Sequence, residues 1–428
     1  MTINSATHDF VRRHADDDVR QLALRGSRDA AVDMTVALQQ IQGRQTARRK
    51  LPSWAAADEI VYPPHLNMEQ CSSEQTARYK AGLAAATGLS GSSGSSGSSG
   101  PSEPSRPPTF LDLTGGFGVD FAFMSRGFAR AIYVERDPDL CDIVRHNLSV
   151  LGVEATVVCA DAADVLHRTD HVALTFMDPA RRDDHGARTY AISDCTPDVL
   201  SMKDELLQKS ERVMLKLSPM LDWRKTVADL GDDCVSEVHI VSVAGECKEL
   251  LVVMQKSISS ERQLRLVCVN DDSVYEPFWP KTRSVLAQNE KHFGPKRSLF
   301  WPKTSADGAT LYLYEPNASV MKAGCWSALE RDFGVEQIAE NSHLFVSDRL
   351  NDRFPGRRFQ VSAITSLNRR ELRTALDGLD RANITVRNFP LSASDLRRRL
   401  KISEGGSTYL FATTLADGNH VLLVCRQP

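Results

Sequence analysis

An acidic side chain stands 17 residues beyond a cluster of glycines, and residues of these types at this spacing could bind a nucleoside. The run FLDLTGGFGVD (110–120) places Gly115, Gly116 and Gly118 directly after a short apolar stretch, and Glu135 follows in IYVERD. Glycine allows a tight turn and lets a ligand approach the bare backbone. Because Glu135 ends the next expected strand, its carboxylate could accept both hydroxyls of a ribose.

Two classes of cofactor suit this pattern. A dinucleotide fingerprint requires G-x-G-x-x-G/A. Gly116 and Gly118 supply its first two glycines, but Phe121 occupies the third position, where a small residue would let the helix pack closely on the strand. The remaining pattern, D-x-x-G-G-x-G from Asp112 with an acid after the second strand, resembles motifs I and II of class I S-adenosylmethionine-dependent methyltransferases. We therefore expect S-adenosylmethionine rather than NAD.

Further polar residues follow the next three expected strands. Asp161 comes after the third strand and could accept a hydrogen bond from an adenine amino group. Asp178-Pro179-Ala180-Arg181 comes after the fourth strand, which the proline ends because it has no N–H to donate. Open α/β sheets bind ligands at this carboxyl edge. Lys216 ends the fifth strand there and could neutralise a phosphate or Asp178. We expect Asp178, Pro179, Arg181 and Lys216 to form the catalytic site.

The chemistry at this edge has two candidate forms. Methyltransferases of base amino groups hold the target with Asp/Asn-Pro-Pro-aromatic, whereas Ala180 and Arg181 stand here in place of the second proline and the ring. Arg181 could instead stack on a base or hold a phosphate, and Tyr190 could supply a ring. Methylation at C5 of a pyrimidine needs a thiolate nucleophile. Cys247, in the AGECK turn, is the candidate, although a single cysteine among nine is more often structural.

Composition indicates an ordinary globular protein of 428 residues, enough for two to four domains. The net charge of −3 argues against general polyanion binding by the whole chain. No apolar run approaches the roughly 20 residues of a membrane span, and the N-terminus lacks the apolar region of a secretory signal. Nine cysteines without C-x-x-C or metal spacing suit reduced thiols, so we expect a cytoplasmic protein without a metal.

Changes in pattern along the chain suggest five segments. Helical apolar spacing fills most of 1–85, and the Ser/Gly/Pro-rich 86–108 is typical of a flexible linker, its GSS repeat being also typical of engineered linkers. Strands and helices alternate over 109–256 and end in an expected antiparallel hairpin. An irregular polar stretch to about 310 precedes a small α+β unit in 257–356. A last α+β unit occupies 357–428.

The C-terminal segment has a charge opposite to that of the rest of the chain. Residues 351–428 carry 13 lysines and arginines against 7 acids, a net of +6. Such asymmetry indicates a module that faces a polyanion. The basic residues are most closely spaced just before the pair Gly405-Gly406. Instead of binding a nucleic acid, they could form a solvated helix face or bind another protein. The expected nucleic-acid-binding residues are Arg397, Arg398, Arg399 and Lys401.

The whole pattern resembles a bacterial family of class I methyltransferases with a ferredoxin-like insert and a C-terminal THUMP-like domain. The motifs that carry the resemblance are YPPHLNMEQCSSEQTARYKA, FLDLTGGFGVD, FMDPARRD, VMLKLSPMLD, LYEPNASVMKAG and NITVRNFPLSASDLRRRLKISEGG with YLFATTLADGNHVLLVC. It implies a Rossmann-like α/β sheet of seven strands in the order 3-2-1-4-5-7-6, an N-terminal helical region and small α+β C-terminal domains. It also implies S-adenosylmethionine as the cofactor.

The same resemblance bears on the substrate, because THUMP domains generally present structured RNA, often tRNA, to a catalytic domain. It therefore implies that a base in tRNA or rRNA is methylated. Two other classes remain open from the sequence. A small-molecule methyltransferase would not need the basic C-terminal segment, and a non-catalytic RNA-binding protein could retain the cofactor fold.

Overall fold

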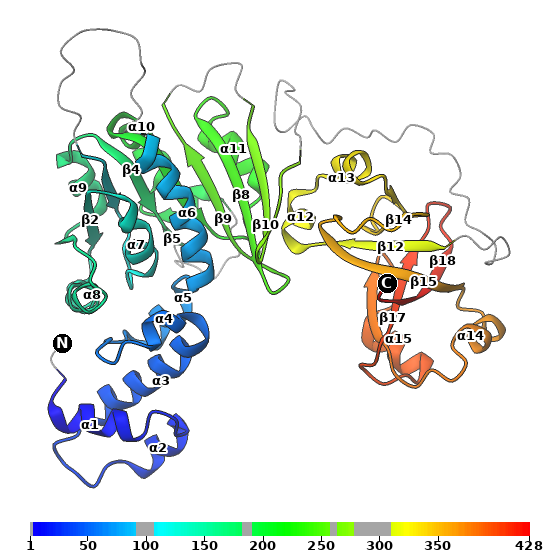
Figure 1. The fold of residues 1–428 in the computed structure, drawn as a ribbon, viewed down its shortest axis with the longest axis horizontal. Coiled ribbons are helices and arrows are strands. Elements are labelled where there is room, and N and C mark those ends of the chain that lie inside the picture. Colours follow the sequence, from blue (N-terminus) through cyan, green and yellow to red (C-terminus); the bar gives the residue numbers. More distant parts are fainter. Residues whose placement is uncertain (1–2, 91–106, 182–190, 257–262, 278–309) are drawn as a thin grey trace. The chain divides into compact units, whose positions relative to one another are not determined.

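The protein forms two compact units in the computed structural model (Figure 1). The first consists of Met1–Val238 and Leu250–Arg262, and the second of His239–Glu249 and Gln263–Pro428. Most of the expected linker at 86–108, the side chain of Arg181, and Tyr190 lie outside the described residues. The structure describes residues 3–90, 107–181, 191–256, 263–277 and 310–428.

The N-terminal region is helical, as its apolar spacing predicts. Three of its helices begin where an Asn or Asp side chain accepts a hydrogen bond from a backbone N–H of the first turn, at Asn4, Asp18 and Asp33. The helices are α1 (Ser5–Arg13), α2 (Val19–Arg25), α3 (Met34–Lys50), α4 (Pro52–Ala55), α5 (His65–Gln70) and α6 (Glu74–Ser90).

A nine-stranded sheet forms the centre of the methyltransferase-like segment, with the order β11-β10-β8-β9-β7-β4-β1-β2-β3. Leaving out β10 and β11 gives the predicted order 3-2-1-4-5-7-6 for the other seven strands. The expectation of irregular structure from 257 to about 310 is wrong for β10 and β11, which extend the sheet beyond β8. The strands are β1 (Thr109–Asp112), β2 (Arg130–Glu135), β3 (Thr156–Cys159), β4 (Val172–Met177), β7 (Ser210–Leu217), β8 (Val235–Val243), β9 (Glu246–Met254), β10 (Arg265–Asn270) and β11 (Ser273–Tyr275).

The strand order reverses direction between β1 and β4. Both strands are parallel neighbours, and the chain leaves β1 toward β2 but leaves β4 toward β7. Right-handed crossovers then place α7 (Val119–Met124) and α8 (Pro138–Val150) on one face of the sheet. They place α9 (Ala162–Arg168) and α10 (Val199–Lys209) on the other. The carboxyl ends of β1 and β4 therefore flank the crevice where open α/β sheets bind ligands.

The N-terminal helices and the sheet share one hydrophobic core. Trp54 of the N-terminal region packs edge-on against Phe117, inside the glycine-rich turn, with ring centroids 5.0 Å apart. The fully buried side chain of Asn147 on α8 exchanges two 2.9 Å hydrogen bonds with the backbone of Val61. The helical region is thus packed directly behind the predicted cofactor-binding turn.

The second unit is built on a seven-stranded sheet with the order β13-β14-β12-β15-β18-β17-β16. Strand β12 pairs with β15 in antiparallel fashion over six residue pairs. The buried carboxylate of Glu315 binds Arg357 and Arg387, which come from two other strands. The elements are β12 (Leu311–Pro316), α12 (Ala318–Ala323), α13 (Trp326–Phe333), β13 (Glu336–Gln337), β14 (Phe345–Ser347), β15 (Gly356–Thr365), α14 (Arg369–Ala375), β16 (Asn383–Arg387), α15 (Ala393–Leu400), β17 (Thr408–Thr414) and β18 (His420–Arg426).

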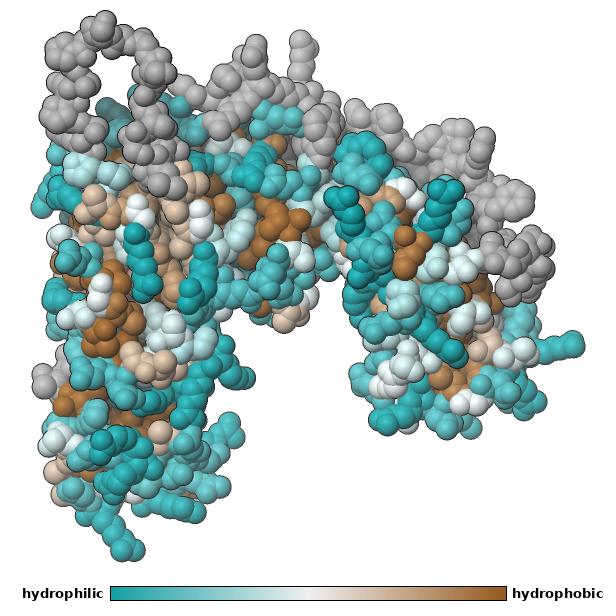
Figure 2. Space-filling model, in the orientation of Figure 1, coloured by the Kyte–Doolittle hydropathy of each residue, from teal (hydrophilic) through white to brown (hydrophobic). Residues whose placement is uncertain are grey.

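Hydrophilic side chains cover most of the visible surface of each unit, and hydrophobic patches between them are small (Figure 2). Among the described residues, no helix combines the length and the apolar character needed to cross a membrane. All nine cysteines are free thiols.

Candidate active site

The glycine-rich turn after β1 has a conformation that only glycine accepts easily. A Cβ atom on Gly115 would lie 2.0 Å from the ring of Tyr133, so no side chain fits there. Gly116 and Gly118 have φ values of 54° and 79°, in the left-handed region that favours glycine. The hydroxyl of Tyr133 donates a hydrogen bond to the carbonyl of Gly116. Tyr133 therefore fixes the turn through its ring and its hydroxyl, and the absence of glycine side chains lets a ligand come close to the backbone.

The carboxylate of Glu135 accepts hydrogen bonds from the glycine-rich turn and from the backbone that follows β2. Its Oε2 accepts a 3.0 Å hydrogen bond from the backbone N–H of Gly116. Its Oε1 accepts from the N–H groups of Arg136 and Asp137 at 2.8 and 3.0 Å. Each carboxylate oxygen has two lone pairs, so this half-buried group can still accept from a hydroxyl. The geometry fits a ribose held beside the glycine turn.

Asp112 and Asp161 flank this position with different degrees of exposure. Asp112 ends β1, is 1% exposed and accepts a 3.0 Å hydrogen bond from the N–H of Thr114. Burial raises the pKa of Asp112 well above its usual range, and the carboxylates of Asp120, Asp178 and Glu135 add to this effect. Asp161 is exposed and begins α9 by accepting a 2.9 Å bond from Ala163 N–H.

Asp178 lies directly after β4 and is fixed through its backbone and its carboxylate. Its N–H donates a 2.6 Å hydrogen bond to the hydroxyl of Thr114, which belongs to the glycine-rich turn. Its Oδ2 accepts from the ammonium of Lys216 at 2.5 Å. Pro179 is buried, and the two-residue strand β5 (Ala180–Arg181) pairs with β6 (Cys195–Thr196). The structure thus brings Asp178 and Lys216 together beside the turn.

Several acidic groups are close enough to influence one another at this edge of the sheet. Burial raises the pKa of Asp112, and the charges of Asp120, Asp178 and Glu135 raise it further. Among the residues that the structure describes, no cluster of His, Cys, Asp or Glu could hold a metal ion.

Sequence reasoning missed four side chains of this site. Thr114 holds the backbone of Asp178, and Asp120 lies 3.6 Å from the ammonium of Lys216. Ser72 and Lys80 reach Asp120 from the N-terminal region. Thr114 lies two residues from Asp112, and Ser72 and Lys80 lie within the motif YPPHLNMEQCSSEQTARYKA. The missed signal was the set of polar residues inside two motifs already noted.

Cys247 has an environment that does not suit a nucleophile. It lies within β9 rather than in the turn where we expected it, because the turn consists of Ala244 and Gly245 alone. Both turn residues have positive φ, as in a two-residue hairpin connection. Burial raises the pKa of the Cys247 thiol, although Lys322 acts in the opposite direction. The neutral thiol is a poor nucleophile.

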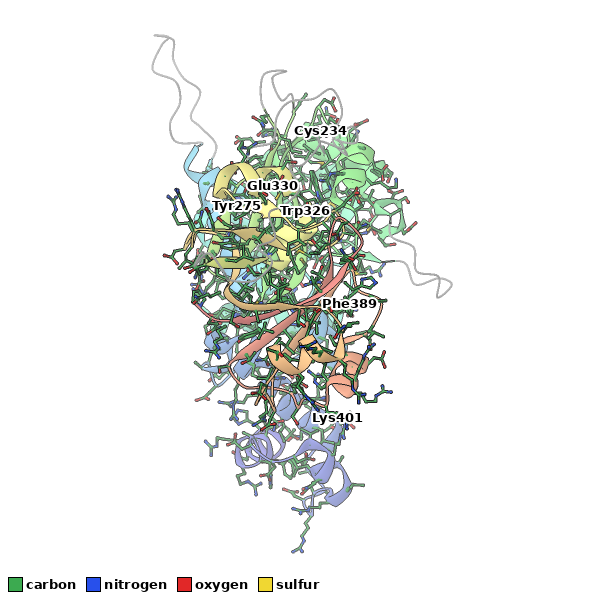
Figure 3. The ribbon with its side chains drawn as sticks, turned by 90° about the vertical axis from the view of Figure 1, so that its right-hand side faces the viewer. Cys234, Tyr275, Trp326, Glu330, Phe389 and Lys401 are labelled. Carbon is green, nitrogen blue, oxygen red and sulfur yellow. The ribbon has the colours of Figure 1, made fainter. Side chains whose placement is uncertain are left out.

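The predicted basic cluster lies at the end of α15 in the second unit. Arg397 is 28% exposed and lies 3.7 Å from Glu404, whereas Arg398 is 78% exposed and pairs with Asp395 on the same helix. Arg399 and Lys401 are exposed, and Figure 3 marks Lys401 at the end of the helix. Sequence reasoning missed Arg381, whose guanidinium lies over Gly405 and donates to the carbonyl of Glu404.

Comparison with known proteins gives matches over the whole chain. A ferredoxin-like domain family matches residues 312–355, and a THUMP domain-like family matches 356–427. Two curated Mycobacterium tuberculosis proteins, each named as an uncharacterized S-adenosylmethionine-dependent methyltransferase, are 26% identical over 74% of this chain and 80% of their own. A crystal structure from Porphyromonas gingivalis W83, described as that of a candidate methyltransferase, is 29% identical over all of both chains, with a TM-score of 0.77.

The fold, the site and these relatives define the class of this protein. It is an S-adenosylmethionine-dependent methyltransferase with the class I methyltransferase fold, and its C-terminal segments match the ferredoxin-like and THUMP-like domain families. The resemblance stated from the motifs is confirmed. The NAD-binding alternative has no support from these relatives.

Proposed function

We propose that this S-adenosylmethionine-dependent methyltransferase modifies a base in structured RNA, either tRNA or rRNA. The class of reaction follows from the fold and the relatives. The RNA substrate is the proposed part, and the exposed basic cluster of the THUMP-like domain is the observation that carries it.

The cofactor would be held by the residues around the glycine-rich turn. We assign the ribose to Glu135, the adenine amino group to Asp161, and the close backbone approach to Gly115, Gly116 and Gly118. Asp112 would support the turn from its buried position at the end of β1, where its carboxyl group accepts a hydrogen bond from the N–H of Thr114. Three hydrogen bonds from backbone N–H groups to Glu135 support this assignment, because they fix its carboxylate beside Gly116.

The acceptor would be held by Asp178 with Lys216 and the flanking Pro179 and Arg181. When bound, S-adenosylmethionine supplies a methyl group whose carbon–sulfur bond breaks as the acceptor atom attacks, leaving S-adenosylhomocysteine, and the acceptor releases a proton. Asp178 would accept a hydrogen bond from the acceptor and so orient it, and positioning is the main contribution an enzyme makes to such a displacement. Pyrimidine C5 chemistry through Cys247 is disfavoured by the raised pKa of its thiol.

The exposed charges at the end of α15 support the proposal that this surface binds phosphates. Arg398, Arg399 and Lys401 are exposed, and the one ion pair of Arg398 seen here is with an exposed acid on its own helix. Exposed ion pairs of this kind contribute little free energy, so phosphates can replace the acid at low cost. Arg381 adds a guanidinium beside the same glycine turn. We also propose a cytoplasmic location, which the nine free thiols support.

The triple variant R397A/R398A/R399A tests this proposal. We expect weaker binding to tRNA and rRNA fragments, about uniformly across sequences, with a salt dependence whose slope falls by roughly one per lost phosphate contact. Affinity for S-adenosylmethionine should not change. The control R12A/R13A/R20A removes the same charge from exposed positions of the N-terminal helices and should keep RNA affinity.

RNA binding by the triple variant equal to that of the parent at several salt concentrations would contradict the proposal. A small-molecule acceptor would then be the better interpretation. A protein that binds RNA but not S-adenosylmethionine would instead be a binding protein with a retained fold. Nucleoside mass spectrometry of tRNA and rRNA from a deletion strain would identify the methylated base.

A further inference from the structure

A line of alternating charges runs from the N-terminal region to Asp178. The ammonium of Lys80, on α6, lies 3.2 Å from Oδ1 of Asp120 at the start of α7. Oδ2 of Asp120 lies 3.6 Å from the ammonium of Lys216, which in turn lies 2.5 Å from Oδ2 of Asp178. The hydroxyl of Ser72 donates a 2.7 Å hydrogen bond to Asp120. Two cations and two carboxylates thus form one connected network within the first unit.

The inner half of this network is buried, which is costly. The side chain of Lys80 is 0% exposed and that of Asp120 is 10% exposed, whereas that of Asp178 is 38% exposed. Well-packed apolar side chains often replace a buried ion pair without loss of stability. The Lys80–Asp120 pair is buried and is connected through Lys216 to the partly exposed carboxylate of Asp178. We therefore expect this pair to have a role other than stability.

The geometry shows that two carboxylates compete for Lys216. Asp120 and Asp178 both lie within ion-pair distance of its ammonium, and the shorter contact is to Asp178. Lys80 and Lys216 hold the pKa of Asp120 below its usual range against the effect of burial. With Lys80 in place, the charge of Asp120 is balanced by a second cation. Without Lys80, the buried carboxylate of Asp120 would draw Lys216 away from Asp178.

We propose that Lys80 is a positioning residue for methyl transfer. By neutralising Asp120 it leaves the ammonium of Lys216 on Oδ2 of Asp178, so that Oδ1 can face the acceptor. Ser72 assists by donating a hydrogen bond to the same carboxylate. Helix α6 must therefore be docked on α7 for the acceptor site to have its working arrangement. This inference rests on the proposed role of Asp178 in holding the acceptor.

The test compares the full-length variants K80M and K80M/D120N with the parent. Methyl transfer from radiolabelled S-adenosylmethionine to total RNA of a deletion strain gives kcat, and calorimetry gives the cofactor Kd. We expect K80M to lower kcat about tenfold, within the range of coupling between charges that share a network. Its cofactor Kd should stay within about twofold of the parent value. The double variant should recover most of kcat, because no carboxylate then competes for Lys216.

A matched control separates positioning from stability. Arg212 lies on β7, the strand of Lys216, and forms an ion pair with Glu237, whose side chain is 12% exposed. R212M should lower the free energy of unfolding and leave kcat per folded molecule unchanged. A purely structural role for Lys80 predicts that K80M behaves like R212M. Unchanged kcat in folded K80M, or no recovery in the double variant, would overturn the inference.

Two further variants keep the test decisive. If K80M does not fold, S72A removes one hydrogen bond to Asp120 and should lower kcat about threefold, with recovery in S72A/D120N. Parent-like kcat in S72A would then overturn the inference. If D178A retains parent activity, the proposed acceptor role of Asp178 fails by itself. Loss of activity in D178A combined with full activity in K80M would refute only the role of Lys80.

Discussion

Replacing Glu135 by alanine should weaken S-adenosylmethionine binding by about 1–3 kcal/mol, which corresponds to roughly 5- to 150-fold in Kd. The size follows from what the carboxylate does. Ribose hydroxyls would lose a charged acceptor, and the N–H of Gly116 would lose its 3.0 Å partner in the folded turn. The N–H groups of Arg136 and Asp137 are exposed and can bind water instead, so they add little to the loss.

The variant E135Q refines this prediction. Its amide oxygen can still accept from the N–H groups of Arg136 and Asp137, whereas its NH₂ group would face the N–H of Gly116 and repel it. We therefore expect E135Q to bind the cofactor more weakly than the parent. It should also bind more tightly than E135A, because one acceptor oxygen remains for a hydroxyl.

Isothermal titration calorimetry with S-adenosylmethionine and with NADH provides the assay. D142A is the control, because it removes an exposed acid from α8, close to Glu135 in sequence, and should leave Kd unchanged. Parent-like affinity in a folded E135A would refute the assignment of Glu135 to the ribose. Binding of NADH without binding of S-adenosylmethionine would refute the choice of cofactor.

Three other substitutions give separate expectations. D178A should keep cofactor affinity and lower kcat roughly 10- to 150-fold, the value of a hydrogen bond to a charged acceptor; equal turnover would remove Asp178 from the site. Burial raises the pKa of Asp112 above its unfolded value, so the folded state binds the proton more tightly and stability falls as pH rises through the folded pKa. D112N should therefore raise the free energy of unfolding at neutral pH while weakening cofactor binding, and chemical denaturation at several pH values would expose an opposite trend. C247S should keep most activity, and complete loss would favour C5 chemistry.

The sequence allowed correct predictions of those elements that a local motif or residue pattern specifies. The order of the seven core strands agrees with the resemblance, and the glycine turn lies where FLDLTGGFGVD placed it. Strands β10 and β11 escaped prediction because they are short and lie in a segment of polar, aromatic and proline clusters. Strand β11 pairs with β10 in a short hairpin, and the other partner of β10 is β8, which stands well before it in the chain.

The network behind Asp178 could not be predicted for a different reason. Lys80, Asp120 and Lys216 lie far apart in the sequence, and each is an ordinary charged residue in its own segment. Only the packing of α6 on α7 and of both on the sheet brings these charges within ion-pair distance. In the same way, Arg381 joins the basic cluster through the fold, since it stands 16 residues before Arg397.

The boundary between the two C-terminal domain families has a consequence for fragments of this protein. The ferredoxin-like match ends at residue 355 and the THUMP-like match begins at 356, yet β12 and β15 on either side are paired in one sheet. A cut at this boundary would turn both strands into unpaired edges, which promote aggregation. It would also separate Glu315 from Arg357 and Arg387. We expect the two segments to unfold in a single transition, so a soluble fragment should begin before Leu311.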